Sequence, residues 1–272
     1  MLNWRLSPTP SHSAVPLVSA VSYLNTTPLV WGLDVSPDLR LEFDLPSRCA
    51  DRVREGSADI GILPVVEIQR QELDFFPETG IACRGPVRSI LLVSKVDPRR
   101  IRTLAADSGS RTSVMLTRIL LAERYSSEPA VLTLPADLEP MLAQADAALL
   151  IGDAALHVDP VALSQRYTVL DLGEEWIKHT GLPMIFALWA GAKTNMTARL
   201  RGVFLEAAKA GVQRIDEIVV RECPPRNIPL LLGREYLTDN IAFLLNERDH
   251  QGREAYLRLA RQFDTLGVST TV

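Results

Sequence analysis

The chain has 272 residues, of which 47% are hydrophobic and 6% aromatic, and its formal net charge is −4 at pH 7. This length and apolar content allow one large or two modest domains with a substantial core. The acidic balance argues against a nucleic-acid partner, because binding along a phosphate backbone needs a surplus of Lys and Arg.

The beginning of the chain does not resemble a signal peptide, and no apolar run reaches the length of a membrane span. The three cysteines, Cys49, Cys83 and Cys223, are widely spaced and form no C-x-x-C pair. Such spacing disfavours a zinc site or a disulfide framework. We therefore expect a cytoplasmic protein with buried thiols, no metal and no membrane association.

The first predicted elements are a leader, a strand and a helix. Residues 1–15 are rich in Ser, Pro and Thr and predict a disordered leader. Residues 16–24 predict a buried strand. Asn25 or Thr26 can cap the helix that follows, with Pro28 in its first turn.

The next predicted elements complete a βαβ unit. Alternating apolar residues predict a half-buried strand over residues 39–47, with Leu41, Phe43 and Leu45 facing inward. A short helix and a further strand at 58–66 follow. A unit of this kind predicts parallel strands joined in the right-handed sense.

Strands and helices then alternate a second time. Residues 80–95 predict two strands joined through Gly85 and Pro86, and a second α/β series runs from Arg99 to Lys193. From Thr197 onward the apolar spacing is helical, including residues 234–246.

A second α/β series inserted into the first predicts a mixed α/β fold of two lobes, joined by two crossovers, with a ligand cleft between them. We expect the first lobe to comprise residues 16–95 and 193–272 and the second lobe to comprise residues 96–192. The hinges are expected near residues 93–97 and 190–193.

Polar residues follow three of the predicted strands. They are Asn25, the cluster at residues 110–113, and the pair Gly152 and Asp153. Ligands of open α/β sheets lie beyond the carboxyl ends of parallel strands, and helix starts there attract carboxylates or phosphates. Since one hydroxyl is enough to cap a helix, Thr112 and Ser113 remain to bind an anion.

Each of these features also has an ordinary structural interpretation. Asn25, Gly152 and Asp153 fit simple caps and turns. Arg111 fits a solvated surface cation, although a buried guanidinium can clamp a carboxylate. Ser89 interrupts an apolar strand and faces either solvent or the cleft. Dinucleotide-binding, P-loop, zinc-protease and serine-hydrolase motifs are all missing from the sequence.

Seven segments in series resemble the chorismate dehydratase family of the futalosine route to menaquinone, from about Pro16 to Val268. The resemblance implies a fold like the type II periplasmic solute-binding proteins, used as a cytosolic enzyme without metal or redox cofactor. The implied reaction removes water from chorismate to give 3-(1-carboxyvinyloxy)benzoate. The segments are "VSYLNTTPLVWGL", "GSADIGILPVVE", "GPVRSILLVS", "SRTSVMLTRILL", "DAALLIGDAAL", "DLGEEWIKHTGLPMIFALWA" and "YLTDNIAFLLN".

The resemblance also implies site residues. Asn25 and Ser89 match family positions beside the reacting ring and are the candidates for catalysis. Because neither is a base at neutral pH, we expect the enolpyruvyl carboxylate of the substrate to take the proton. The candidates for substrate binding match the family's S-R-T-S block and G-D-A-A-L element, and they are Ser110, Arg111, Thr112, Ser113, Gly152 and Asp153.

Two other functions remain open. The sister family that makes 1,4-dihydroxy-6-naphthoate has a histidine where this chain has Gly152, which disfavours that reaction. A binding or sensing module of the same fold would close on an organic anion without chemistry. We also expect a functional hand-off of the product to the next pathway enzyme. Met184 and Ile185 depart from the family pattern and are expected to reshape the pocket wall slightly.

Overall fold

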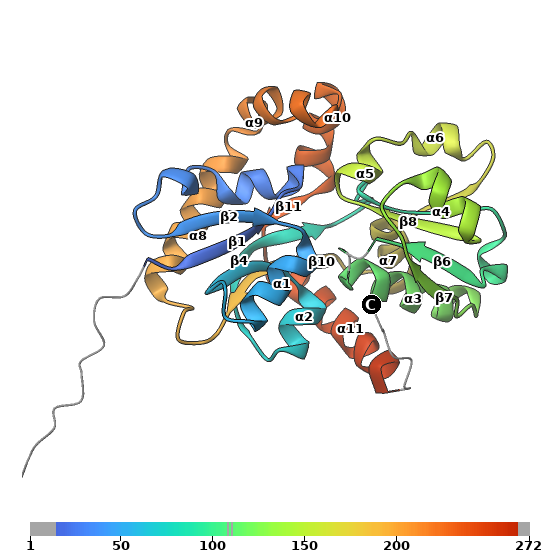
Figure 1. Cartoon of the computed structure of the whole chain (residues 1–272), viewed down its shortest axis with the longest axis horizontal. Coiled ribbons are helices and arrows are strands. Elements are labelled where there is room, and N and C mark those ends of the chain that lie inside the picture. The colour runs from blue at the N-terminus through green and yellow to red at the C-terminus, as the bar shows by residue number, and fades with distance from the viewer. Residues whose placement is uncertain (1–14, 108, 110, 266–272) are drawn as a thin grey trace, which may run out of the picture.

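The computed structural model describes residues 15–107, 109 and 111–265 of the chain. Its strands form two separate sheets that lie side by side, each flanked by helices (Figure 1). The elements around the six-stranded sheet are called the first half below, and those around the five-stranded sheet the second half. The predicted leader lies outside the described residues, apart from Val15.

The six-stranded sheet has the order β11-β4-β10-β3-β1-β2. Its first three strands along the chain are parallel, as predicted, while β10 runs antiparallel to both of its neighbours. Every residue of β3 and β10 is buried, because both faces of the sheet centre are covered. The strands are β1 (Leu17–Val21), β2 (Arg40–Asp44), β3 (Ile60–Pro64), β4 (Asp74–Cys83), β10 (Met184–Gly191) and β11 (Ala242–Leu244).

The helices of the first half come from both ends of the chain. The segment after β1, predicted to be a helix, forms the short 3-10 helix η1, and α8 packs directly on it. These elements are η1 (Leu24–Val30), η2 (Leu33–Val35), α1 (Pro46–Arg54), α2 (Val65–Arg70), α8 (Ala198–Val212), α9 (Ile215–Glu222), η4 (Pro224–Arg226), α10 (Leu230–Glu235), the π-helix η5 (Tyr236–Asn240) and α11 (Glu247–Thr265).

The five-stranded sheet has the order β7-β6-β8-β5-β9. Its strands β6, β7 and β8 are parallel, and β5 is antiparallel to both of its neighbours. In Figure 1, α3 and α7 lie on one face of this sheet and α4 on the other. The elements are β5 (Ile90–Ser94), η3 (Pro98–Arg100), β6 (Thr103–Ala106), α3 (Arg111–Tyr125), β7 (Ala130–Thr133), α4 (Leu138–Gln144), β8 (Ala147–Ile151), α5 (Asp153–Leu156), α6 (Pro160–Leu163), β9 (Thr168–Asp171) and α7 (Leu172–Thr180).

The boundary between the halves differs from the predicted one. Strand β5 belongs to the second sheet and β10 to the first, so the predicted lobe boundaries at residues 95 and 192 each fall one strand too late. The chain crosses between sheets at residues 84–89 and 181–183 instead of 93–97 and 190–193. A buried strand has the same apolar pattern in either sheet, so the pattern does not reveal which sheet a strand joins.

Two further local predictions are wrong. Phe43 and Leu45 are 55% and 44% exposed, because β2 is an edge strand with little covering it. The segment 234–246 is not one helix, since it passes from α10 through η5 into strand β11. The helical spacing predicted for α8, α9 and α11 is confirmed.

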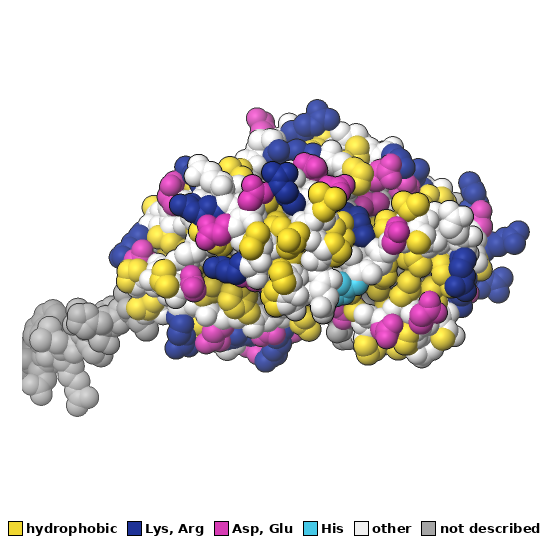
Figure 2. Space-filling model, turned by 90° about the horizontal axis from the view of Figure 1, so that it is seen from above, with side chains coloured by type: hydrophobic (Ala, Val, Ile, Leu, Met, Phe, Trp, Pro, Cys, Tyr) yellow, Lys and Arg dark blue, Asp and Glu magenta, His cyan; other side chains and the backbone are white. Residues whose placement is uncertain are grey.

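Among the described residues, none of the helices has the length and apolar character needed to cross a bilayer. Acidic and basic side chains are intermixed over most of the face shown in Figure 2. The described residues on this face therefore form no large region of a single charge that would by itself select a ligand.

Candidate active site

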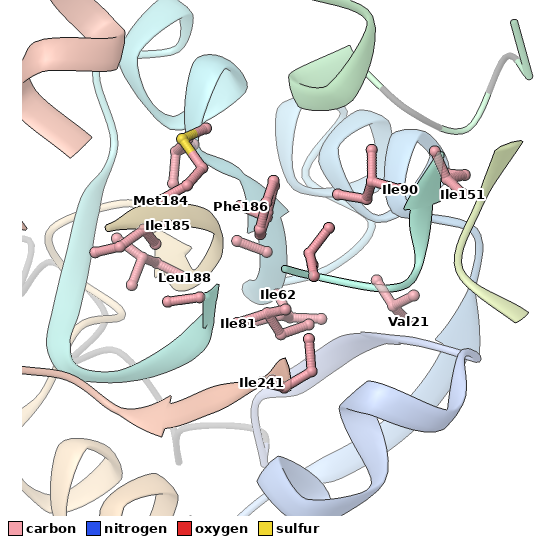
Figure 3. Packing of buried hydrophobic residues seen from close by; sticks show 14 of the residues in the cluster. Val21, Ile62, Ile81, Ile90, Ile151, Met184, Ile185, Phe186, Leu188 and Ile241 are labelled. Atoms are coloured by element: carbon pink, nitrogen blue, oxygen red, sulfur yellow. The ribbon is translucent and has the colours of Figure 1, made fainter. Parts of the chain in front are cut away.

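A small cavity with a volume of about 70 Å³ lies between the two halves. Its wall is formed by residues of both sheets and by the beginning of α3. Figure 3 shows apolar side chains from both sheets around this region, with Ile90 and Ile151 on paired strands. Apolar side chains in the wall include Val21, Ile81, Ile90, Ile151 and Phe186.

The structure brings most of the predicted site residues to this one cavity. Ser110 lies outside the described residues, and Asp153 is not part of the wall. Met184 and Ile185 are fully buried in β10 and do not reach the wall. The predicted residues that line the cavity are Asn25, Ser89, Arg111, Thr112, Ser113 and Gly152.

Asn25 and Ser89 are linked through a third residue, Tyr236. Asn25 Nδ2 donates to Tyr236 Oη at 2.9 Å, and Tyr236 Oη donates to Ser89 Oγ at 2.8 Å. Asn25 Oδ1 is buried and has no partner among the described residues. Sequence reasoning missed Tyr236, because it lies in a segment whose apolar spacing is typical of an ordinary helix.

Ser89 is held by an uncommon backbone conformation at the residue before it. Arg88 has φ of 62°, and the Ser89 amide donates to the carbonyl of Val87 at 2.7 Å. This three-residue turn is rare and strained for a residue with a side chain. The Asp171 carboxylate accepts from the Arg88 amide, and the Arg88 guanidinium donates to the carbonyl of Ala155. These anchors keep the turn, and with it Ser89, in place.

Arg111 lines the cavity but uses its guanidinium to join the halves. It donates to Glu67 Oε2 at 3.1 Å and to Asp51 Oδ1 at 3.0 Å. Both carboxylates belong to helices of the first half, whereas Arg111 begins α3 of the second. Its side chain is 19% exposed. Arg111 is therefore not the solvated surface cation that one interpretation of the sequence predicted.

The hydroxyls of Thr112 and Ser113 differ in what they contact. Thr112 Oγ1 donates to the carbonyl of Phe186 at 3.3 Å, so its hydrogen is already used within the protein. The Ser113 hydroxyl has no hydrogen-bond partner within the described part of the chain, and Ser113 lies in the cavity wall. Ser113 and the beginning of α3 are thus the better placed anion donors, because the first N–H groups of a helix have no intrahelical partner.

Gly152 makes room in the cavity wall for the ring of Tyr23. It has φ of 57°, and a Cβ there would lie 2.6 Å from Cδ2 of Tyr23. The Gly152 amide already donates to the carbonyl of Ser89, and α5 is a single turn of four residues. This helix start therefore does not offer the second anion site that the sequence predicted.

Asp153 joins the two halves outside the cavity. Its carboxylate accepts from the amide of Leu24 at 3.0 Å and lies 3.4 Å from the guanidinium of Arg226. Burial raises the pKa of Asp153, while the Leu24 amide and Arg226 oppose that rise. Asp153 is therefore placed to fix η1, which carries Asn25, against the second half.

The cavity wall holds no conventional base. Its described residues include no Asp, Glu, His or Lys. Burial raises the pKa of Tyr23 and of Tyr236 well above the usual value, so both phenols stay protonated at neutral pH. In residues 15–107, 109 and 111–265, no group of three or more His, Cys, Asp or Glu is arranged to hold a metal ion.

Two α/β halves around a shared cavity are typical of the class of periplasmic-binding-protein-like folds, and solved structures of that class are similar to this chain. A protein of Archaeoglobus fulgidus gives a TM-score of 0.72 at 12% identity, covering 92% of this chain and 98% of its own. The periplasmic aliphatic sulphonate binding protein of Escherichia coli gives 0.63 at 15% identity, covering 93% and 89%. A Candida albicans protein described as having the generic periplasmic binding protein fold gives 0.65 at 14% identity, covering 96% and 92%.

Sequence comparison identifies the family within this class. The family model described as menaquinone biosynthesis matches residues 16–262. The chorismate dehydratase of Thermus thermophilus is 30% identical over 206 residues, which cover 69% of this chain and 73% of that protein. The chain belongs to this menaquinone biosynthesis family.

Proposed function

We propose that the chain is a hydro-lyase that dehydrates chorismate to 3-(1-carboxyvinyloxy)benzoate in menaquinone biosynthesis by the futalosine route. The family match and the name of the Thermus thermophilus relative support this assignment. The single observation that carries it is that Asn25 and Ser89 share one hydrogen-bonded series in the wall of one cavity. These are the two residues that the family resemblance predicts for catalysis.

The reaction suits a cavity without a metal or nucleophile. The ring proton beside the enol ether is acidified by conjugation to the ring carboxylate, and loss of the adjacent hydroxyl makes the ring aromatic. Aromatisation supplies the driving force. The protein has to fix the reactive conformer, stabilise negative charge and exclude water, and a largely apolar cavity between two halves meets these needs.

The residues divide the work as follows. Asn25 and Ser89 contact the departing hydroxyl. Ser113 and the first turn of α3 receive a carboxylate, with Arg111, Thr112 and Gly152 shaping that end of the cavity. Because the described wall has no Asp, Glu, His or Lys, the substrate's own enolpyruvyl carboxylate takes the ring proton.

Incubation of the protein with chorismate tests this proposal. The diene absorbance is expected to fall while a benzenoid product appears. Replacement of Asn25 by Ala is expected to lower kcat by about 10²-fold or more, since it removes a group that contacts the leaving oxygen. Asn195→Ala is the matched control, because Asn195 donates to the carbonyl of Asp59 away from the cavity. Near-normal turnover by Asn25→Ala would contradict the assignment.

The same incubation separates the two alternative functions. Chorismate binding without turnover would favour a module that binds or senses an organic anion. The sister family has a histidine where this chain has Gly152, and the ring of Tyr23 occupies the place where even a Cβ at Gly152 would lie. The geometry thus favours chorismate dehydration over dihydroxynaphthoate synthesis.

We place the reaction in the cytoplasm. Cys49, Cys83 and Cys223 are free and buried, which fits a reducing compartment. The product keeps a reactive enol ether, so transfer to the next pathway enzyme is part of the same proposal. The test compares the rate of the next pathway enzyme when it is given purified product with its rate when this protein makes the product in the same solution. A faster rate in the second case would support direct transfer.

A further inference from the structure

Three buried polar side chains from distant parts of the chain form one hydrogen-bonded series. Asn25 Nδ2 donates to Tyr236 Oη, and Tyr236 Oη donates to Ser89 Oγ, over sequence separations of 211 and 147 residues. Asn25 and Ser89 line the cavity, whereas Tyr236 lies behind them and is 1% exposed. Tyr236 therefore acts on a ligand only through the other two residues.

The series has a direction because a phenol has a single hydrogen. An amide NH2 group can only donate, so Tyr236 Oη accepts from Asn25 and gives its own hydrogen to Ser89 Oγ. Ser89 then keeps its hydroxyl hydrogen for another partner. Asn25 keeps Oδ1, a buried acceptor without a partner in the described part of the chain. The two wall residues are thereby left as one donor and one acceptor.

We propose that Tyr236 is a positioning residue that sets this polarity, so that Ser89 donates to the leaving hydroxyl of the substrate and Asn25 Oδ1 accepts from it. The inference rests on the proposed function and deepens it. A substrate hydroxyl carries one hydrogen and two lone pairs, so it can satisfy both wall residues at once.

The chemical step balances with these partners. The C–O bond breaks with both electrons passing to oxygen, while the neighbouring ring carbon loses its proton to the enolpyruvyl carboxylate. The electron pair of that C–H bond becomes part of the aromatic ring. Hydroxide and the proton leave together as one water, so no oxidant or reductant is needed. The hydrogen bond from Ser89 strengthens as charge develops on the oxygen.

Two further observations suit this role. Burial raises the pKa of Tyr236, so the phenol keeps the hydrogen on which the polarity depends. Tyr236 also begins the π-helix Tyr236–Asn240, a backbone irregularity that occurs often at functional sites.

Tyr236→Phe in the full chain tests the inference, because it removes the hydroxyl and keeps the ring. We expect kcat for chorismate dehydration to fall by about 10-fold to 10²-fold with KM within about twofold, since the lost interaction matters most in the transition state. The same change is expected to cost less in a Ser89→Ala background than in the unaltered chain, because part of the effect of Tyr236 passes through Ser89. An additive loss would indicate a merely structural role and would overturn the inference.

Tyr125→Phe is the matched control. It removes a hydroxyl that donates to Glu175 Oε2 at 3.3 Å, away from the cavity, and it is expected to leave kcat unchanged. Normal turnover by Tyr236→Phe beside an active unaltered chain would reject the role of Tyr236 alone. No turnover by the unaltered chain would reject the proposed function as well.

A measurement on the unaltered chain removes any dependence on how Tyr236→Phe folds. Neutron diffraction from deuterated crystals locates hydroxyl and amide hydrogens directly. We expect the Tyr236 deuterium to point at Ser89 Oγ and both Asn25 amide deuterons to lie on the atom nearest Tyr236. A Tyr236 deuterium pointing at residue 25 would overturn the assigned polarity.

Discussion

Gly152 of the second half packs directly against the ring of Tyr23 of the first half. A Cβ at Gly152 would lie between 2.6 and 2.9 Å from three atoms of that ring. The Tyr23 ring therefore rests on the backbone of the second half, at the cavity wall. A single added methyl group has to displace the ring or the loop that carries it.

We expect Gly152→Ala to lower stability by about 2–4 kcal/mol, from backbone strain at positive φ together with overpacking. It should also lower kcat/KM by about 10²-fold, since the cavity wall shifts. Gly181→Ala is the matched control, because Gly181 has φ of 71° but nothing within 4 Å of an added Cβ. That variant should lose about 1 kcal/mol and keep its activity. If Gly152→Ala and Gly181→Ala had equal effects on urea unfolding and on turnover, the contact with Tyr23 would be unimportant.

At the scale of single residues, the sequence predicts the cavity residues that follow strands. It does not predict a buried residue that contacts those residues without lining the cavity. Asn25, Ser89 and Ser113 follow or interrupt strongly apolar segments, so their polar side chains are conspicuous. Tyr236 is not conspicuous, because a tyrosine among helical apolar residues is typical of a core position. Its two partners are 147 and 211 residues away, and only the folded chain brings them together.

At the scale of elements, α8 fixes the position of η1, which carries Asn25. A Cβ at Gly211 of α8 would lie 2.0 Å from the carbonyl oxygen of Pro28 in η1. The two elements therefore touch backbone to backbone. No side chain stands between them that could repack to absorb a change.

We expect Gly211→Ala to destabilise the protein by about 1–3 kcal/mol, although alanine is the better helix former, because the methyl group must push η1 away. The same shift moves Asn25 and should lower kcat. Gly202→Ala in the same helix is the control, since nothing lies within 4 Å of its added Cβ. It should stabilise by up to about 1 kcal/mol. Denaturant unfolding of the two variants compares them directly, and a Gly211→Ala protein as stable as Gly202→Ala would contradict this account.

Apolar periodicity predicts most elements of this chain but not their partners. The fully buried strands β3, β8 and β10 are short apolar runs, a pattern consistent with a strand buried on both faces. Which sheet β5 or β10 joins depends on hydrogen bonds to strands far away in the chain. The exposure of Phe43 likewise depends on β2 being an edge strand, and local spacing does not reveal that position.

At the scale of the whole molecule, polar links hold the halves together on two sides of the cavity. On one side Asp153 meets the Leu24 amide and Arg226. On the other side Arg111 meets Asp51 and Glu67. The fold class predicts a cleft between two lobes, but only the structure shows that Arg111, expected to contact substrate, also contacts the opposite half.

These two roles of Arg111 make different predictions. Arg111→Met removes both ion pairs and any substrate contact, whereas Asp51→Asn combined with Glu67→Gln removes the pairs and leaves the cation. If the ion pairs stabilise the arrangement in which the halves are closed around the cavity, both variants lower the fraction of closed molecules. A fall of that fraction to about one tenth would raise KM by about 10-fold in each variant. If Arg111 acts chiefly on the substrate, only Arg111→Met raises KM.

We expect the first result, because the guanidinium already donates to two carboxylates, one of them 6% exposed. Loss of these charged hydrogen bonds should also lower stability by about 1–3 kcal/mol. Small-angle X-ray scattering without ligand checks the cause, since a wider separation of the halves increases the radius of gyration. An unchanged radius in both variants, with KM altered only in Arg111→Met, would assign Arg111 to the substrate and show that its ion pairs do not stabilise the closed arrangement.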